Sequence, residues 1–401
     1  MTDTPPEIKK GRNQLAAVIV IGHALKHVYM GGFQAVILPE IKIGLSLSAT
    51  QLGAVASSRQ AMGWISTMGA GYLGDRYPER SSLILGISLA LMGGSYFLAG
   101  ISTTFWVMLA AMLLVGVGPS LFHPPALGVL SRRFPDARGL AASLHGTGGT
   151  IGEMLGPLTA AGLLAWLTWS GILQISMFPA IAAGFLVWRL VKSLPGSSSD
   201  SDSFRAYMGT LFGLLKRRPL LLLVLSTVLR SIGQNGAIVF LPIYLREDLE
   251  FSPTRVAVYL SLTQVVGIGS QPAMGYLSDI FGRKAILMPA TVALGLLLIA
   301  LKFADPGFQL TLTIVVLGGF LFSLHEICIA AATDVAGGTM QATMASLIYG
   351  ASFLGAFSPL FAGMIVDATD ATPNAFLYGG AVVLAGALIL PLLKLPRIVN
   401  Q

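Results

Sequence analysis

Residues 71–80 read Gly-Tyr-Leu-Gly-Asp-Arg-Tyr-Pro-Glu-Arg and stand at the end of a long apolar stretch. Residues 275–284 read Gly-Tyr-Leu-Ser-Asp-Ile-Phe-Gly-Arg-Lys and end another such stretch, 204 positions later. A second pair of segments has nearly the same offset: Leu-Phe-His-Pro at 121–124 corresponds to Ser-Leu-His-Glu at 323–326. This repetition predicts two halves of like architecture that follow in the same order along the chain.

The composition places these repeats in a membrane protein. Of the 401 residues, 54% are hydrophobic and 11% are charged, whereas an average soluble domain carries roughly 25% charged residues. Apolar stretches of about 20 residues recur from end to end, and each is long enough for a helix to cross a bilayer. A soluble enzyme, a disordered chain and a disulfide-built secreted domain are excluded. The one cysteine, Cys328, can form no internal disulfide.

Twelve such stretches are present, six on each side of a polar segment. The predicted fold is therefore an all-α integral membrane protein with twelve transmembrane helices in two pseudo-symmetric six-helix halves. The halves are residues 1–190 and 219–401, and a cytoplasmic linker at 191–218 joins them. The predicted spans are 13–38, 49–73, 80–100, 104–130, 138–165, 168–190, 219–246, 254–279, 284–303, 308–333, 340–366 and 372–394.

The basic residues decide the orientation. Eighteen of them lie on the side that holds both termini and the linker, and four lie on the opposite side: Lys42, Arg246, Arg255 and Lys302. Because cytoplasmic loops collect Lys and Arg, both termini are predicted to be cytoplasmic. The expected location is the plasma membrane, the inner membrane in a bacterium. The net charge of +7 reflects this topology, and no nucleic-acid partner is expected.

With its paired loops, two halves and basic linker, the chain resembles the major facilitator superfamily over essentially its whole length. The loops are similar to the family's G-x-L-x-D-R-x-x-x-R motif, from which Pro78, Glu79 and Ile280 depart. The resemblance implies a secondary transporter that works by alternating access, and not an enzyme. It also implies a gating role for the loop residues Asp75, Arg76, Arg80, Asp279 and Arg283.

Two motifs narrow this resemblance. Residues 148–157 read Gly-Gly-Thr-Ile-Gly-Glu-Met-Leu-Gly-Pro, which is similar to the Gly-Pro antiporter motif of drug-exporting members. The run Phe122-His123-Pro124 resembles the fosmidomycin-resistance exporters, although Pro125 stands where that family has Glu. The resemblance implies drug:proton antiport.

Ten ionisable side chains lie within the predicted spans, where a charge costs about 3 kcal/mol or more. They are Lys26, Arg59, Glu153, Arg230, Glu326, His23, His27, His123, His145 and His325. A chain so poor in charge is expected to turn these groups toward an aqueous cavity between the halves rather than toward lipid. The spacing i, i+3, i+4 places His23, Lys26 and His27 on one helix face, and the spacing i, i+4 does the same for Arg230 and Gln234.

The charges of this set favour an anionic or zwitterionic small molecule. Three permanent cations stand against at most two carboxylates, and arginine presents a planar fork that suits carboxylate, phosphate or phosphonate. The substrate-binding candidates are His23, Lys26, His27, Gln34, Arg59, Arg230, Gln234 and Gln264. Two alternatives stay open: polar side chains that only join helices, and closed ion pairs between Arg59 and Glu153 and between Arg230 and Glu326.

The chain has no P-loop, so a proton gradient rather than ATP is expected to drive transport, without a cofactor. The proton-coupling candidates are Glu153, Glu326, His123 and His325. A metal site is not expected, because His23 and His27 have no further Cys, His or carboxylate cluster in the sequence to support them. The predicted function is proton-coupled efflux of a small anionic or zwitterionic compound, similar to a phosphonate drug, by a monomer. The alternative is proton- or anion-coupled uptake of an organic acid or a phosphorylated metabolite.

Overall fold

A computed structural model of the chain describes residues 11–134, 138–191, 209, 213–335 and 341–395. All regular elements in these ranges are helical, as predicted. The chain divides into two compact units: residues 1–46 with 58–201 form the first unit, and residues 47–57 with 202–401 form the second. Most of the predicted linker, 191–218, lies outside the described residues.

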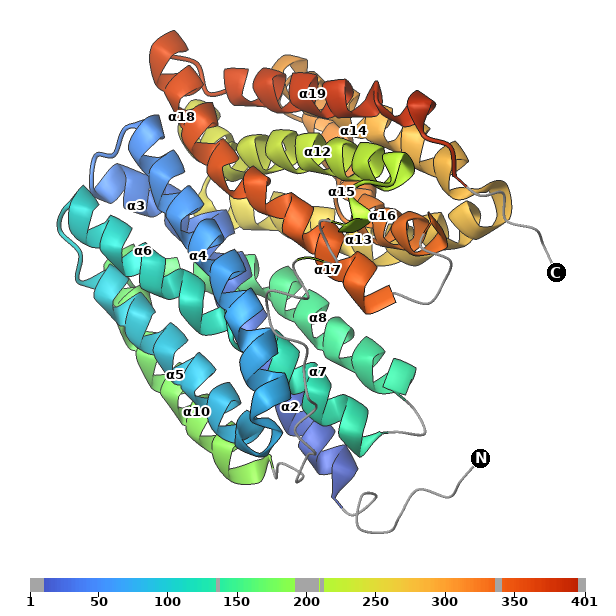
Figure 1. The fold of residues 1–401 in the computed structure, drawn as a ribbon. Helices are drawn as coiled ribbons and strands as arrows, with labels where there is room; N and C mark the ends of the chain where they lie inside the picture. Colours follow the sequence, from blue (N-terminus) through green and yellow to red (C-terminus); the bar gives the residue numbers. More distant parts are fainter. Residues whose placement is uncertain (1–10, 135–137, 192–208, 210–212, 336–340, 396–401) are drawn as a thin grey trace. The chain divides into compact units, whose positions relative to one another are not determined.

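The helices of the first unit follow one another in the predicted order (Figure 1). They are α2 (Arg12–Gly32), the π-helical turn η1 (Phe33–Ile37), α3 (Leu38–Gly44), α4 (Ala49–Arg76), η2 (Pro78–Arg80), α5 (Ser81–Gly100), α6 (Phe105–Ser120), α7 (His123–Arg133), α8 (Arg138–Leu164), α9 (Trp169–Ile175) and α10 (Met177–Leu190). The first turns of α4 belong to the second unit and the rest of this helix to the first.

The second unit repeats this order of long helices. Its elements are α12 (Arg218–Ile243), the π-helical turn η3 (Tyr244–Asp248), α13 (Pro253–Phe281), α14 (Arg283–Phe303), α15 (Phe308–Leu321), α16 (Ser323–Val335), α17 (Gln341–Ala351), η4 (Ser352–Phe357), α18 (Ser358–Thr369), α19 (Asn374–Ala387) and η5 (Leu390–Leu392). In each unit a π-helical turn ends the first spanning segment or interrupts it.

Nine helical stretches of the described residues are long and apolar enough to cross a membrane. Three further helices, α4, α8 and α13, have 28, 27 and 29 residues, which also exceeds the length that a bilayer requires. They correspond to the second, fifth and eighth predicted spans and carry more glycine and polar residues than the other nine. The chain is thus a multi-pass, twelve-helix membrane protein, as predicted.

Several predicted spans are bent rather than straight. The fourth span breaks between α6 and α7, next to Pro119 and Pro124. The eleventh changes to a 3-10 helix in η4, directly before Pro359. Proline lacks the backbone N–H that continues a helix and clashes with the preceding turn, which explains both breaks. The first break places His123 at the first position of a new helix.

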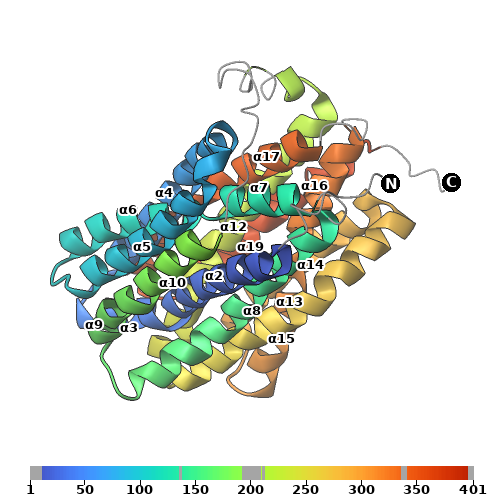
Figure 2. The ribbon, with the colours of Figure 1, turned by 90° about the horizontal axis from the view of Figure 1, so that it is seen from below.

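Close packing between α2 and α8 shapes the centre of the first unit (Figure 2). A Cβ added to Gly152 would overlap the carbonyl of Ala24, and one added to Gly156 would lie 2.6 Å from the backbone nitrogen of Gly32. Only glycine permits the two backbones to approach this closely. The glycines of 148–157 therefore serve packing here, and the approach brings the side chains between them together.

Candidate functional site

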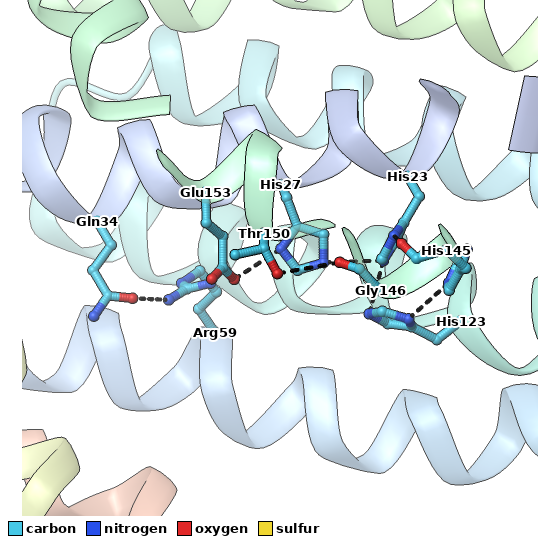
Figure 3. Close-up of polar contacts among 9 residues, drawn as sticks. All are labelled: His23, His27, Gln34, Arg59, His123, His145, Gly146, Thr150 and Glu153. Atoms are coloured by element: carbon cyan, nitrogen blue, oxygen red, sulfur yellow. Dashed lines mark hydrogen bonds and ion pairs between the residues drawn. The ribbon is translucent and has the colours of Figure 1, made fainter. Parts of the chain in front are cut away.

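Four histidines and one carboxylate meet in the first unit (Figure 3). His23 and His27 come from α2, and His123 comes from the start of α7. His145 and Glu153 come from α8, two turns apart. The close approach of α2 and α8 places this group inside the unit, where His23 is 1% exposed and His145 is 3% exposed.

The members of this group are joined by polar contacts. His23 Nδ1 lies 2.7 Å from the His145 carbonyl oxygen, and His23 Nε2 lies 3.1 Å from His27 Nε2. His27 Nδ1 lies 2.8 Å from Glu153 Oε1. Two longer contacts of 3.4 Å join His123 Nε2 to His23 Nε2 and His123 Nδ1 to His145 Nε2. We call these five residues the histidine–glutamate chain.

Lys26 lies beside the histidine–glutamate chain and is 1% exposed. It is close enough to Glu153, His23 and His27 for their charges to interact. A buried ammonium requires a compensating charge nearby. The Glu153 carboxylate is the negative group that meets this need within the described part of the first unit.

His23, His123 and His145 meet the distance criterion for a three-ligand metal group, since one ring nitrogen from each lies within 4.8 Å of the others. This grouping was not foreseen from the sequence. Zinc would need three nitrogens at about 2.1 Å from a single point. However, the two contacts of His123 use its two different ring nitrogens, and Lys26 adds a positive charge beside them. The arrangement fits a hydrogen-bonded chain better than a cation site.

Arg59 of α4 is oriented by a glutamine. Its Nη2 donates to Gln34 Oε1 at 3.2 Å, and its guanidinium lies 5.9 Å from the ring centroid of Phe33. Gln34 belongs to the π-helical turn η1. Such turns often mark functional positions, because the extra residue redirects side chains. Figure 3 shows Arg59 and Gln34 at the Glu153 end of the histidine–glutamate chain.

The second unit contains a comparable arginine. Arg230 of α12 is 4% exposed and donates from Nη1 to Gln234 Oε1 at 2.9 Å. Gln234 in turn donates to the Leu321 carbonyl, where α15 ends. Cys328 lies next to this guanidinium and is a free, buried thiol. Arg230 and Gln234, which we assigned to one site on their i, i+4 spacing, therefore do interact.

The two ion pairs that the sequence left open as an alternative are absent among the described residues. Glu153 pairs with His27 rather than with Arg59, and both arginines bond to glutamines. Glu326 is exposed on α16. The alternative of closed pairs between Arg59 and Glu153 and between Arg230 and Glu326 is therefore wrong for this structure.

His325 and Glu326 both lie near Tyr349, and His325 also lies close enough to Arg230 for their charges to interact. The His325 ring packs against Tyr349, with 4.5 Å between ring centroids. Its neighbour Glu326, about 100° away around the helix, is also close enough to Tyr349 for their charges to interact. Gln264 is half-buried on α13.

The predicted gating residues of the second loop form an ion-pair network. Arg283 bonds to Asp279 and also to Asp334 Oδ2, 3.0 Å from its Nε. Asp334 lies near the end of α16 and was not identified from the sequence, because no local motif contains it. In the first loop Arg80 is exposed and lies 3.9 Å from Glu79. The side chains of Asp75 and Arg76 lie outside the described residues.

Comparison with known proteins decides the family. The sequence profile of the Major Facilitator Superfamily matches residues 27–272 and 223–400, which is nearly the whole chain. The chain belongs to the Major Facilitator Superfamily. It is therefore a secondary transporter of a small molecule, and members of this family are not enzymes.

Two curated relatives match over most of their length. An uncharacterized MFS-type transporter YfnC of Bacillus subtilis strain 168 is 24% identical, over 91% of this chain and 90% of the relative. The fosmidomycin resistance protein of Escherichia coli strain K12 is 25% identical, over 86% of each chain. Multidrug resistance proteins are also among the relatives.

Solved structures support the fold of this superfamily member. A mutant of the nucleoside transporter NupG matches with a TM-score of 0.80 and 15% identity, over 94% of this chain and 99% of the other. A bacterial homologue of the lysosomal transporter Spinster matches with a TM-score of 0.75 and 16% identity, over 96% of this chain and 95% of the other. At these identities the likeness concerns the fold alone.

Proposed function

We propose that this transporter exports small anionic or zwitterionic compounds in exchange for protons, with phosphonate antibiotics such as fosmidomycin as the first candidates. The observation that carries the proposal is the bonding of two intramembrane arginines, of which Arg230 is buried and Arg59 is half-buried. Arg59 and Arg230 are each oriented by a glutamine, through Gln34 and Gln234. A neutral amide fixes the position of a guanidinium without cancelling its charge, so each arginine keeps its positive charge for a ligand.

A buried arginine without a carboxylate partner is unfavourable in the absence of a ligand. An anion that bonds to the guanidinium fork would remove this cost, and phosphonate and carboxylate both match the geometry of the fork. The similarity to a fosmidomycin resistance protein supports the phosphonate class and the outward direction. We assign proton coupling to the intramembrane carboxylates and histidines, with Glu153 and Glu326 as candidate carriers.

Transport assays in proteoliposomes test the proposal. A pH gradient is imposed, and movement of labelled fosmidomycin and of protons is recorded together. We expect coupled fluxes in the wild type and a loss of at least about tenfold in Arg59→Ala and Arg230→Ala, since each removes a charge-assisted contact. Arg189→Ala, an exposed position at the end of α10, is the matched control and should transport normally. Wild-type rates in both variants would contradict the proposal.

Uptake of an organic acid or a phosphorylated metabolite is the second candidate. The same unneutralised arginines favour it, because a phosphate offers the fork the same oxygens as a phosphonate. The same vesicles distinguish the two candidates when sugar phosphates and dicarboxylates are tested in both directions of the gradient.

A further inference from the structure

The histidine–glutamate chain contains three short contacts in series. They run from the His145 carbonyl oxygen to His23 Nδ1, from His23 Nε2 to His27 Nε2, and from His27 Nδ1 to Glu153 Oε1, at 2.7, 3.1 and 2.8 Å. All three lie within the range of protein hydrogen bonds, so each requires one hydrogen between its two heavy atoms.

The neutral side chains cannot supply three hydrogens. A neutral imidazole carries one ring N–H, so His23 and His27 together contribute two. The His145 carbonyl and an ionised Glu153 carboxylate only accept. With two hydrogens, one of the three contacts would bring two lone pairs together inside the unit, which is costly. The observed geometry therefore requires a third hydrogen.

This third hydrogen has a restricted set of positions. The first contact fixes an N–H on His23 Nδ1, because the carbonyl opposite cannot donate. In one arrangement, the extra proton lies between His27 Nδ1 and Glu153 Oε1, and His27 Nε2–H donates to His23 Nε2. In the other, His27 Nδ1–H donates to the carboxylate, and the extra proton lies between the two Nε2 atoms. The proton passes between these positions by breaking one N–H or O–H bond and forming another, and the net charge of the chain stays at zero.

A path leads away from these three contacts. His123 Nε2 lies 3.4 Å from His23 Nε2, and His123 Nδ1 lies 3.4 Å from His145 Nε2. His145 Nδ1 is buried without a hydrogen-bond partner among the described residues. A proton on His23 Nε2 can therefore move to His123 Nε2 while the His123 Nδ1–H proton moves to His145 Nε2, which leaves His145 protonated on both ring nitrogens. The longer contacts mean that ring motion accompanies these two steps.

The surrounding charges make the proton exchangeable. Lys26 of α2 lies close enough to the chain for their charges to interact. Arg59 of α4 stands at the Glu153 end of the chain, and His123 of α7 and His145 of α8 close the other end (Figure 3). With the third proton the chain is neutral beside the two cations. Without the third proton, Glu153 is an anion beside Lys26. The attraction between these two charges compensates for the hydrogen bond that the chain loses.

We propose that His23, His27 and Glu153 together store one proton, and that the coupling proton of the first unit binds here. His123 and His145 relay this proton away from the three residues. The inference rests on the proposed proton-coupled function. It assigns His23 and His27 to the proton rather than to the substrate, and it selects Glu153 over Glu326 as the carrier.

The first experiment counts protons without any substrate. Purified full-length protein in lipid nanodiscs is titrated between about pH 5 and 9, a range in which ordinary exposed carboxylates stay ionised. In Glu153→Gln the amide N–H₂ donates permanently to His27 Nδ1 and keeps the contact without an exchangeable proton. We expect this variant to release one proton fewer per molecule than the wild type. Glu79→Gln, an exposed position on η2, should release the same number as the wild type.

The second experiment separates the store from the transport function. Gradient-driven flux and equilibrium exchange of labelled fosmidomycin are compared in vesicles. Glu153→Gln and His27→Gln should lose driven flux by at least about tenfold and keep exchange within about twofold, since exchange needs no net proton transfer. If the wild type itself shows no driven flux, the proposed function fails and the proton count alone decides the store.

Three outcomes would overturn the store. The first is an unchanged proton count in Glu153→Gln. The second is full coupling in both variants while the wild type is coupled, which leaves the proposed function standing. The third is one tightly bound metal ion per purified wild-type molecule together with metal-shifted ¹⁵N signals of the histidines. That result would make His23, His123 and His145 ligands instead of relay groups.

Discussion

The carboxylate of Asp367 caps the helix that begins at Ala49. Its Oδ1 accepts the backbone N–H of Ala49 at 2.9 Å, and its Oδ2 accepts that of Thr50 at 2.8 Å, both within the second unit. Ser48 and Gln51 add reciprocal bonds between the backbone of each and the side chain of the other. The first N–H groups of a helix have no partner within the helix, and a negative charge there also complements the helix dipole.

Glycines make this capping contact possible. A Cβ on Gly363 would overlap the carbonyl of Ala49, and a Cβ on Gly53 would overlap that of Pro359. The start of α4 and α18 therefore lie backbone to backbone, and Ser57 Oγ accepts the N–H of Leu360 at 3.2 Å one step further along. The carboxylate, the glycines and the serine form one continuous contact.

Removal of the Asp367 charge is expected to weaken this contact. In Asp367→Asn the amide nitrogen cannot accept a backbone N–H, so the free energy of unfolding should fall by about 1 kcal/mol, the usual value of a helix cap. Thermal unfolding in detergent measures the change. Glu79→Gln, an exposed position on η2, is the control for loss of one carboxylate. Equal midpoints for the two variants would mean that the cap contributes nothing.

The packing of α2 on α8 predicts opposite effects for two glycines of α8. Gly152→Ala would push a methyl group against the carbonyl of Ala24 and should destabilise the protein by about 1–3 kcal/mol. An added Cβ at Gly162 meets no atom within 4 Å, so Gly162→Ala should stabilise it by about 0.4–1 kcal/mol through the unfolded chain. The midpoints of thermal unfolding of both variants are compared with that of the wild type. A shift of both midpoints in the same direction would contradict the packing argument.

The glutamine-oriented arginines predict a loss of anion affinity when the glutamine becomes an acid. Gln34→Glu and Gln234→Glu keep the size of the side chain but neutralise Arg59 and Arg230 through closed ion pairs. Fosmidomycin binding by calorimetry should weaken by about tenfold or more, since a charged contact is lost. Gln309→Glu, exposed at the start of α15, serves as the control. Unchanged affinity in both variants would show that neither arginine meets the ligand.

The Arg283 network predicts coupled effects on transport rate. Arg283 bonds to Asp334 at 3.0 Å and to Asp279. Asp334→Asn and Arg283→Gln should each change the transport rate, and the double variant should add little to either, because both remove the same interaction. Their effect on stability should stay below about 1 kcal/mol, since the pair is partly exposed. Strictly additive changes in rate would indicate that the two residues act separately.

Much of the fold was predictable because lipid leaves few choices. Backbone groups in a bilayer must bond within their own segment, so each apolar stretch of sufficient length is a helix. The repeated loops gave the order of the halves, and basic residues gave the expected orientation. The interruptions of the spanning helices were harder to predict. Pro119 and Pro124 indicate the break between α6 and α7, but no sequence pattern indicates the π-helical turn at Phe33–Ile37.

The candidate site was predictable only along single helices. The spacing of His23, Lys26 and His27 placed them on one face, and i, i+4 spacing joined Arg230 to Gln234. Spacing carries no information on which helices touch, and so the partners across helices were either missed or left open as alternatives. Glu153 bonds to His27 and not to Arg59, Asp334 joins Arg283, and Asp367 reaches Ala49.

The sequence by itself determined the class of the molecule: twelve helices, two repeated halves, and ionisable groups placed where lipid penalises them. Composition and periodicity suffice for this, because the bilayer acts on each helix separately. The tertiary structure decided which of these groups share protons and which arginines keep their charge. These properties depend on distances of about 3 Å between side chains from different helices, and glycine contacts such as that of Gly152 with Ala24 set those distances.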